Sequence, residues 1–364
     1  MNWKTIHTLS RVRRYCLPHS LNKELGRALR PYKKIPGLTN INFSFTNLCA
    51  ADCIYCPSQR GGGTARFMSR LSLETILKEC RSRAFQKFHN IQIVSAGENG
   101  DIFLHKECLD FLRMIRRFLP GTKVQAYTNF RMFSPPLIDA VLGEGLLDFI
   151  GCNIDGADQE SYFKVKRTDL GVVTSHLFYF LKKRRRLWKN IPLHIQVLTY
   201  HDYVKSVHNC LGVFPEKLQG QPPDTAVLKD DFPLIRAQFL PYLDHPKDKI
   251  LRSAVIAWAE RDQLKYPDEA ACALDCPQLD RIEKEAFIAP DGTWYACCWD
   301  GKNELALGNV LKESFNEIYF GTKRRRLIES LKRREFALVG GPCAKIQCCQ
   351  ELKIPKASFS ACPK

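Results

Sequence analysis

The chain reads NFSFTNLCAADCIYCPSQR from Asn42 to Arg60, and this stretch decides how the rest of the sequence is interpreted. It places Cys49, Cys53 and Cys56 in a C-x3-C-x2-C spacing. Three thiolates on one short loop can bind three irons of a [4Fe-4S] cluster, which normally takes four cysteines. No fourth cysteine lies near this loop, so one iron of such a cluster would stay open.

A structural zinc site is the main alternative for this loop. Such sites are closed by four Cys or His ligands, but no histidine lies between Ile41 and Phe88, and the next cysteine, Cys80, falls in a helical pattern. Apolar residues alternate at Ile41, Phe43 and Phe45, which predicts a strand. The cysteine loop would then leave the carboxyl end of a strand, where parallel α/β folds carry their active sites.

The three-cysteine spacing, with Tyr55 directly before the last cysteine, resembles the signature of the radical S-adenosylmethionine (SAM) superfamily. The resemblance implies that the open iron binds the amino and carboxylate groups of SAM. One electron from the cluster would then cleave SAM to a 5′-deoxyadenosyl radical, which abstracts hydrogen from a substrate. The resemblance also implies an α/β fold with a partial (β/α)6 TIM-like barrel, open on one side.

Strands and helices are expected to alternate after the cysteine loop. The expected strands are 91–95, 123–128, 148–154, 193–199 and 236–240, and the expected helices are one capped by Ser72, then 106–119, 135–142 and 174–187. With the strand at 41–45, this alternation predicts a parallel α/β architecture. Periodicity does not distinguish an open sheet from a barrel, and the family resemblance favours the barrel.

Two short motifs after later strands resemble SAM-binding motifs of the superfamily. Ala96-Gly97-Glu98 resembles a Gly-Gly-Glu motif that binds the SAM amino group. A glycine there allows close approach of the backbone, and a carboxylate accepts hydrogen bonds from an ammonium. Thr128-Asn129 resembles a Thr-Asn-Gly motif near SAM, with Phe130 in place of the glycine.

A third motif, Asn153-Ile-Asp-Gly156, resembles the superfamily's Ser-x-Asp-Gly. Asn153 would replace a serine that contacts SAM, because an amide can make such a bond. The basic residue that follows in the family falls on Lys166 or Arg167, and the choice stays open. The residues expected to contact SAM are Tyr55, Gly97, Glu98, Asn129, Asn153 and Lys166.

The C-terminal third carries a second set of spaced cysteines. Cys276 is followed by Gly292-Thr-Trp-Tyr-Ala-Cys297, a G-x4-C motif. Pro290-Asp291-Gly292 predicts the turn of a hairpin that carries Cys297 on its second strand. Further thiolates could come from Cys343 and from Cys348 or Cys349.

This region resembles the SPASM/twitch extension of radical SAM enzymes through Ile288-Ala-Pro-Asp-Gly, Cys297-Cys-Trp-Asp300 and Leu307-Gly-Asn309. The further C-x2-C-x5-C-x3-C run of a full SPASM domain is missing, which favours one auxiliary [4Fe-4S] cluster. Its expected ligands are Cys276, Cys297, Cys343 and Cys348, with Cys349 or Cys272 as alternatives at two positions. A zinc site at these thiolates is the other possibility.

Together the resemblances divide the chain into three expected parts. Residues 1–39 would form a basic N-terminal arm, 40–245 the radical SAM core barrel, and 246–364 the auxiliary cluster domain. The 364 residues include 16 cysteines and carry a formal net charge of +17. Met1 to Gly37 lacks the apolar core of a signal peptide, so a reducing cytoplasm and metal-bound thiolates are expected.

The positive charge favours anionic partners, but much of it lies in the helical runs 182–186, 323–326 and 332–334. These runs are expected to form solvated outer helix faces. No apolar run approaches the length of a membrane span, so none is expected, and neither is nucleic-acid binding.

The resemblance implies an enzyme, a radical SAM oxidoreductase. The expected reaction is net oxidation of a small polyol, sugar-like or aminocyclitol metabolite, because an auxiliary cluster could accept an electron from the substrate radical. One alternative is a peptide-modifying maturase that forms thioether or C–C crosslinks or a formylglycine; another is a non-catalytic iron–sulfur electron carrier. The implied partners are a reducing protein such as flavodoxin or ferredoxin and a small-molecule or peptide substrate, with an anionic one favoured by the charge.

Overall fold

The computed structural model describes residues 37–53, 56, 66–97, 99–199, 231–254, 276, 278–301, 303–341 and 343. The chain divides into two units, Met1–Gly37 and Leu38–Lys364. All the elements described below belong to the second unit. The predicted basic arm at 1–39 therefore lies almost wholly outside the described residues.

Six parallel strands form the first part of one sheet. They are β1 (Asn40–Phe43), β2 (Ile93–Ala96), β3 (Lys123–Tyr127), β4 (Phe149–Asn153), β5 (Leu193–Thr199) and β6 (Lys249–Ala254). They lie side by side in the order of the sequence, and each neighbouring pair is parallel. Sequential order is typical of (β/α) barrels, whereas a doubly wound sheet reverses at a switch point. The predicted partial (β/α)6 barrel is therefore confirmed.

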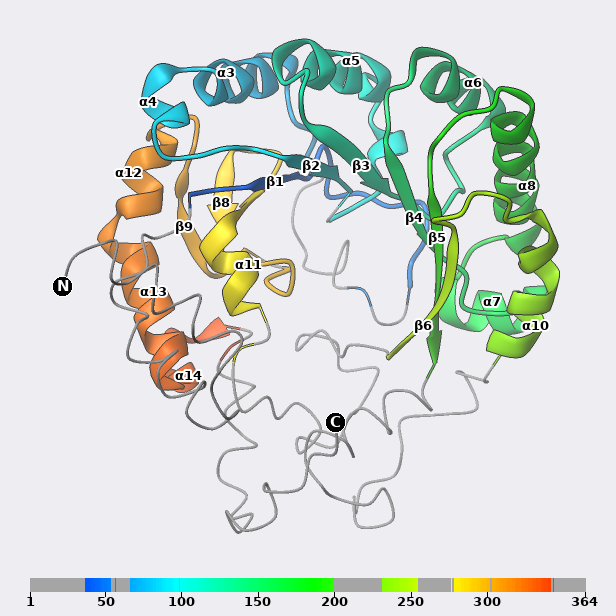
Figure 1. The fold of residues 1–364 in the computed structure, drawn as a ribbon. Helices are drawn as coiled ribbons and strands as arrows, with labels where there is room; N and C mark the ends of the chain where they lie inside the picture. The colour runs from blue at the N-terminus through cyan, green and yellow to red at the C-terminus, as the bar shows by residue number, and fades with distance from the viewer. Residues whose placement is uncertain are drawn as a thin grey trace, which may run out of the picture. The chain divides into compact units, whose positions relative to one another are not determined.

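The helices that connect these strands cover the outer side of the sheet (Figure 1). The long ones are α3 (Arg70–Cys80), α5 (Cys108–Phe118), α6 (Pro135–Glu144) and α8 (Leu170–Arg186). Each buries an apolar stripe; α5, for example, buries Phe111, Leu112 and Ile115, which are spaced to share one helix face. Among the described helices, we find no apolar segment of the length that a bilayer span requires.

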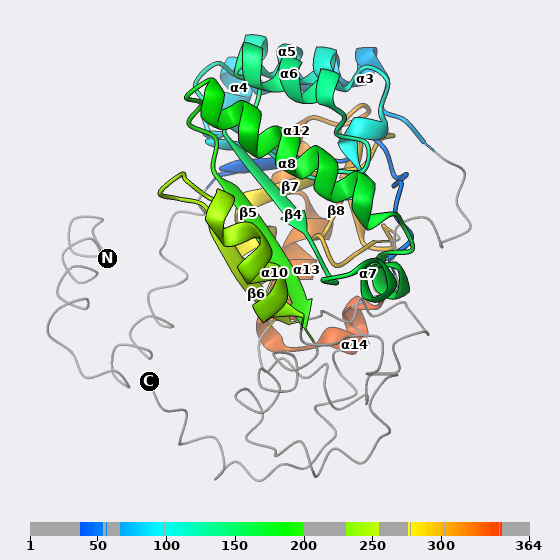
Figure 2. The same cartoon turned by 90° about the vertical axis from the view of Figure 1, so that its right-hand side faces the viewer.

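The shorter connecting elements are α4 (Arg83–Gln86), η2 (Ile102–Leu104), α7 (Gln159–Lys166), α10 (Phe232–Phe239) and η5 (Leu240–Tyr242). In the second view, α8 and α10 lie in front of β4, β5 and β6 (Figure 2). The prediction of a strand at 236–240 is wrong, because α10 occupies most of this segment. Ile235 and Phe239 are buried at a helical spacing of four, and a proline stands in the first turn, where a helix tolerates it.

Two further boundaries differ from the sequence prediction. The helix expected to be capped by Ser72 begins earlier, because the Ser69 hydroxyl accepts a hydrogen bond from the Ser72 N–H at 3.0 Å. The sixth strand, β6, pairs with β5 after the expected domain boundary between 245 and 246. The parallel series therefore extends at least to Ala254.

The C-terminal segment continues the same sheet. Strand β7 (Glu285–Ile288) pairs parallel with β1 on the side away from β2, and the antiparallel strands β8 (Thr293–Tyr295) and β9 (Ala306–Asn309) follow. Four helices accompany them: α11 (Leu279–Lys284), α12 (Phe315–Phe320), α13 (Thr322–Arg333) and α14 (Phe336–Val339). The predicted hairpin is confirmed, with Gly292 in the left-handed region at φ +80°. However, β8 ends two residues before Cys297.

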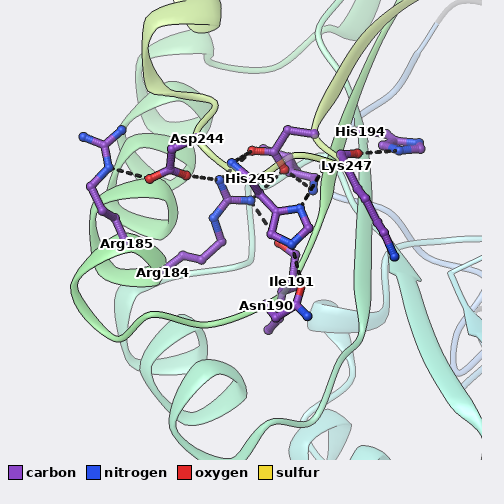
Figure 3. Close-up of polar contacts among 10 residues, drawn as sticks. Arg184, Arg185, Asn190, Ile191, His194, Asp244, His245 and Lys247 are labelled. Carbon is purple, nitrogen blue, oxygen red and sulfur yellow. Dashed lines mark hydrogen bonds and ion pairs between the residues drawn. The ribbon is translucent and has the colours of Figure 1, made fainter.

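The basic runs lie in helices as predicted, but two of their arginines are not solvated. The Arg184 guanidinium in α8 is buried and makes paired hydrogen bonds of 2.8 and 2.6 Å to the Asp248 carboxylate and one of 2.8 Å to Asp244 (Figure 3). Arg324 in α13 is buried and donates to the carbonyl groups of Ile282 and Glu283. Arg184 therefore connects α8 to the segment before β6, and Arg324 connects α13 to the segment before β7.

Candidate metal centre and cofactor site

The three-cysteine loop leaves the carboxyl end of β1, as predicted from the alternation of apolar residues. The described thiols of Cys49 and Cys56 are partly buried, and that of Cys53 is buried. The Cys56 N–H donates to the Cys53 carbonyl at 3.1 Å, which closes a turn between the two cysteines. The Asp52 N–H donates to the Lys166 carbonyl at 3.1 Å. The end of α7 therefore holds the loop in place.

The Cys49 thiol is affected by burial and by nearby charged and ionisable groups. Burial raises the pKa of the Cys49 thiol above its usual range, the nearby Asp101 carboxylate raises it further, and Cys53 and Cys56 add smaller contributions. Iron binding requires thiolates and therefore releases these protons. Three cysteine thiols on one loop fit the open-iron cluster expected from the sequence by their chemistry, since thiolates are the ligands of such clusters.

The described residues contain no group of three His, Cys, Asp or Glu side chains arranged to hold one metal ion.

Gly97 follows β2 at the same end of the sheet. It has a positive φ of +96°, and a Cβ at this position would lie 2.4 Å from the Tyr127 carbonyl oxygen. Only glycine therefore fits this close approach between the ends of β2 and β3. Glu98 and Tyr55, the other residues expected to contact SAM here, lie outside the described residues, so their roles stay predictions.

Asn129 reaches the cysteine loop from the end of β3. Its side-chain N–H donates to the Cys49 sulfur at 3.1 Å, and its amide oxygen accepts a hydrogen bond from the Arg131 N–H at 2.8 Å. The second bond fixes which way the amide faces. The structure therefore brings one residue expected to contact SAM against an expected iron ligand.

Asn153 is the last residue of β4, and Lys166 is the last residue of α7, the helix that follows. The Asn153 amide donates to the Gln196 side-chain oxygen at 3.4 Å. Lys166 forms a 2.8 Å ion pair with Asp155, and both side chains are almost fully buried. Arg167, the alternative to Lys166, lies at the surface and pairs with Asp52 at 3.1 Å. Whether either residue contacts SAM stays a prediction.

Asp101 is a site residue that the sequence analysis missed. It lies four residues after Gly97, is 2% exposed, and accepts hydrogen bonds from the Thr128 hydroxyl at 2.8 Å and the Asn129 N–H at 3.2 Å. An aspartate shortly after a strand, outside any recognised motif, does not indicate from the sequence that it will bond to residues beside the cysteine loop. These two partners follow another strand, β3, and are identified only in the folded chain.

The auxiliary thiols form a second group. Burial raises the pKa of Cys297 to about 12, and the neighbouring Cys343 and Cys276 raise it as well. Burial, and then Cys276, likewise raise the pKa of Cys343 to about 12. Each of these thiols therefore influences the pKa of another, and their chemistry fits the ligands expected for a shared cluster. Cys348, Cys349 and Cys272 lie outside the described residues, so the fourth ligand stays a prediction.

Cys298 and Asp300 have other partners in this region. The Arg281 guanidinium donates to the Cys298 sulfur at 2.9 Å. Asp300 is fully buried, and its carboxylate accepts hydrogen bonds from the N–H groups of Glu304 and Leu305 at 2.8 and 2.9 Å. Asp300 therefore holds the turn that follows Cys297.

Comparison with known proteins identifies the C-terminal region. A family model described as SPASM, an iron-sulfur cluster-binding domain, matches residues 276–349. Two curated proteins from Helicobacter pylori strains, each described as a UPF0026 protein, are 23% identical over 151 residues, which is 42% of this chain and 44% of theirs. The match thus spans less than half the length of these relatives.

Solved structures are similar over most of the chain. Streptococcus suis SuiB bound to S-adenosylmethionine is 11% identical over 88% of this chain and 76% of its own, with a TM-score of 0.50. Native anSMEcpe with bound AdoMet is 14% identical over 86% of this chain and 92% of its own, also with a TM-score of 0.50. BtrN in complex with AdoMet and 2-DOIA is 14% identical over 82% of this chain and 89% of its own, with a TM-score of 0.47.

At such identities, the likeness to SuiB and anSMEcpe shows the fold alone. With the SPASM match, it confirms the predicted resemblance at two levels, the core fold and the SPASM-type C-terminal domain.

Proposed function

We propose that this chain is a radical SAM enzyme in which Cys49, Cys53 and Cys56 hold a [4Fe-4S] cluster that binds SAM. One observation carries the proposal: the loop with the three cysteines follows the carboxyl end of β1, and the Asn129 amide, just after β3, donates a hydrogen bond to the Cys49 sulfur. When bound, the cluster supplies the electron that cleaves SAM reductively to a 5′-deoxyadenosyl radical.

The residues of the chain would hold SAM beside the open iron. Gly97 lets the backbone approach closely, and the Glu98 carboxylate would bind the SAM ammonium. Asn153 would hydrogen-bond the ribose or carboxylate of SAM, and Tyr55 would border the pocket. Lys166 would line the same SAM pocket, where its ion pair with Asp155 holds it in place.

The C-terminal thiols would bind one auxiliary [4Fe-4S] cluster through Cys276, Cys297 and Cys343, with Cys348 as the proposed fourth ligand. The match to an iron-sulfur cluster-binding domain over residues 276–349 supports this assignment. An auxiliary cluster can take up an electron from a substrate radical, so net oxidation is the proposed outcome. The absence from the sequence of the second-cluster cysteine run favours a small polyol or aminocyclitol-like substrate over a peptide. A flavodoxin or ferredoxin would supply the first electron.

The test of this proposal is the formation of 5′-deoxyadenosine from SAM by the anaerobically reconstituted, dithionite-reduced chain. Cys53→Ala should abolish product formation, because the cluster would lose a ligand. Cys80→Ala is the matched control, since Cys80 is also a buried thiol but lies in α3. Product formation that survives in Cys53→Ala would disprove the assignment.

A further inference from the structure

The Asp101 carboxylate joins two segments that meet at the cysteine loop. Asp101 lies between β2 and η2, and one of its carboxylate oxygens accepts a hydrogen bond from the Phe103 N–H at 3.0 Å. The other oxygen accepts from the Thr128 hydroxyl at 2.8 Å and from the Asn129 N–H at 3.2 Å. Three donors thus fix a buried carboxylate, and the carboxylate in turn fixes the end of β3.

The backbone beside Asp101 holds the cysteine loop directly. The Asp101 N–H donates to the carbonyl of Leu48, the residue before Cys49, at 2.8 Å. Gly100 has a φ of +85°, and a Cβ there would lie 2.3 Å from the Thr46 carbonyl oxygen and 2.6 Å from that of Leu48. One turn therefore positions both the cysteine loop and the residue that donates to its sulfur.

A hydrogen bond from Asn129 connects the residues held by Asp101 to the expected iron ligand Cys49. The Asn129 amide donates to the Cys49 sulfur at 3.1 Å. Hydrogen bonds to cluster sulfurs help to set reduction potentials, and outer partners orient the ligands of metal sites. Because reduction adds negative charge, a donor at the sulfur stabilises the reduced cluster more than the oxidised one.

We infer that Asp101 is a positioning residue: by holding Thr128 and Asn129, it directs the Asn129 amide to the Cys49 sulfur, and this hydrogen bond raises the reduction potential of the cluster bound there. This inference rests on the proposed function, because it takes Cys49 to be an iron ligand. Asp101 acts on the Cys49 sulfur through Asn129.

Thr128 offers the cleanest test, because Asp101→Asn would also remove a buried charge. Thr128→Val removes the hydroxyl that donates to Asp101 at nearly constant volume. Thr122→Val is the matched control, since the Thr122 hydroxyl is also buried but donates to the Leu119 carbonyl at 2.8 Å, away from the loop. The readout is the midpoint potential of the SAM-responsive cluster, followed by EPR during an anaerobic redox titration of the full chain.

Thr128→Val and Asn129→Ala should each shift the midpoint to more negative potential, and Thr122→Val should leave it unchanged. Thr128→Ser, which keeps the hydroxyl, should restore the wild-type value. The double variant of Thr128→Val and Asn129→Ala should shift no further than Asn129→Ala alone, because both changes act on one hydrogen bond. Thr128→Ala takes the place of Thr128→Val should the latter not fold.

A potential in Thr128→Val equal to that in Thr122→Val overturns the inference, and so do shifts that add in the double variant. The failure of the proposed function gives a different result. In that case Cys49→Ala would retain the full iron content, whereas normal iron loading with unshifted potentials rejects only the role of Asp101.

Discussion

Lys166 and Asp155 form a buried ion pair between α7 and the segment after β4. Removing one partner from such a pair leaves an uncompensated charge in the interior, which typically costs about 3–5 kcal/mol. Lys166→Met should therefore lower the free energy of unfolding by about that amount. Lys164→Met is the matched control: Lys164 lies in the same helix and pairs with Glu160 at the surface.

For the control we expect a loss below about 1 kcal/mol, because exposed pairs contribute little. Chemical denaturation of both variants under anaerobic conditions measures the difference. Equal losses of unfolding free energy in the two variants would show that the buried pair contributes no more to stability than the exposed pair.

His89 gives the fold a dependence on pH. It is 3% exposed, lies against the rings of Phe85 and Tyr319, and accepts a hydrogen bond from the Leu38 N–H at 3.1 Å. Burial lowers its pKa to about 4, whereas the pKa of a histidine in an unfolded chain is about 6.5. As the pH falls through this window, the unfolded state binds the proton first, so stability is lost.

The thermal unfolding midpoint of the wild type should fall more steeply between about pH 6.5 and 4 than that of His89→Asn. The asparagine keeps an acceptor for the Leu38 N–H but does not titrate in this range. Differential scanning fluorimetry of the two proteins across this pH range makes the comparison. Parallel curves would mean that His89 does not contribute to the acid sensitivity.

At the scale of elements, Gly156 sets how closely α7 approaches the end of β4. A Cβ at this position would lie 2.2 Å from the Tyr162 backbone nitrogen, a contact that only movement of α7 could relieve. Gly156→Ala should therefore displace the carbonyl of Lys166 that holds Asp52 in the cysteine loop. We expect a lower melting temperature and lower iron incorporation.

Gly143→Ala is the control for this change. Gly143 lies in the last turn of α6, and a Cβ built there would have no heavy atom within 4 Å apart from its chain neighbours and the backbone of its own helix. Alanine should stabilise this helix by roughly 0.5–1 kcal/mol, because glycine is less favourable in a helix interior. Iron content per chain and melting temperature are measured for both variants. A Gly156→Ala protein that loads iron normally would argue against the role of α7 in holding the loop.

Elements with a clear local period could be predicted from the sequence, and those fixed by distant contacts could not. The strand before the cysteine loop and the helix α5 follow from the spacing of their apolar residues. The segment 236–240 was assigned to the wrong class because a short apolar run fits either period. The parallel pairing of β7 with β1 joins residues more than 240 positions apart, for example Asn40 and Glu285, and leaves no local signal.

The same distinction holds for the site. Cysteine spacing singled out both groups of thiols, because their members lie close together in the sequence or follow a motif, and their role as ligands stays a prediction. The burial of Arg184 and the role of Asp101 depend on partners on other elements. A charged side chain in a polar run looks solvated until the carboxylates that pair with it are placed beside it.

At the scale of the whole sheet, β1 and β7 connect the two groups of cysteines. Cys49 follows the carboxyl end of β1, whereas Cys297 follows β8, which runs antiparallel to β7 and therefore to β1. The two groups of cysteines thus follow strands that run in opposite directions in the sheet. The SAM site and the auxiliary cluster should thus load independently.

Cys297→Ala should reduce the iron content from about eight to about four per chain, because each [4Fe-4S] cluster holds four irons. SAM cleavage should persist in this variant, while oxidation of a substrate should be lost. Iron and zinc analysis of the wild type, Cys297→Ala and Cys298→Ala, the adjacent control, tests this arrangement. Zinc in place of iron, or about twelve irons in the wild type, would rule out a single auxiliary [4Fe-4S] cluster.

We propose that a cluster held by Cys49, Cys53 and Cys56 keeps one iron open for SAM. The most direct measurement is the EPR spectrum of the reduced chain with and without SAM, with the triple variant of these cysteines to Ala as background. SAM should change the g values of the wild-type signal, because its amino and carboxylate groups would enter the coordination of one iron, and it should leave the signal of the triple variant unchanged. An identical wild-type spectrum with and without SAM, in protein with full iron content, would contradict the claim.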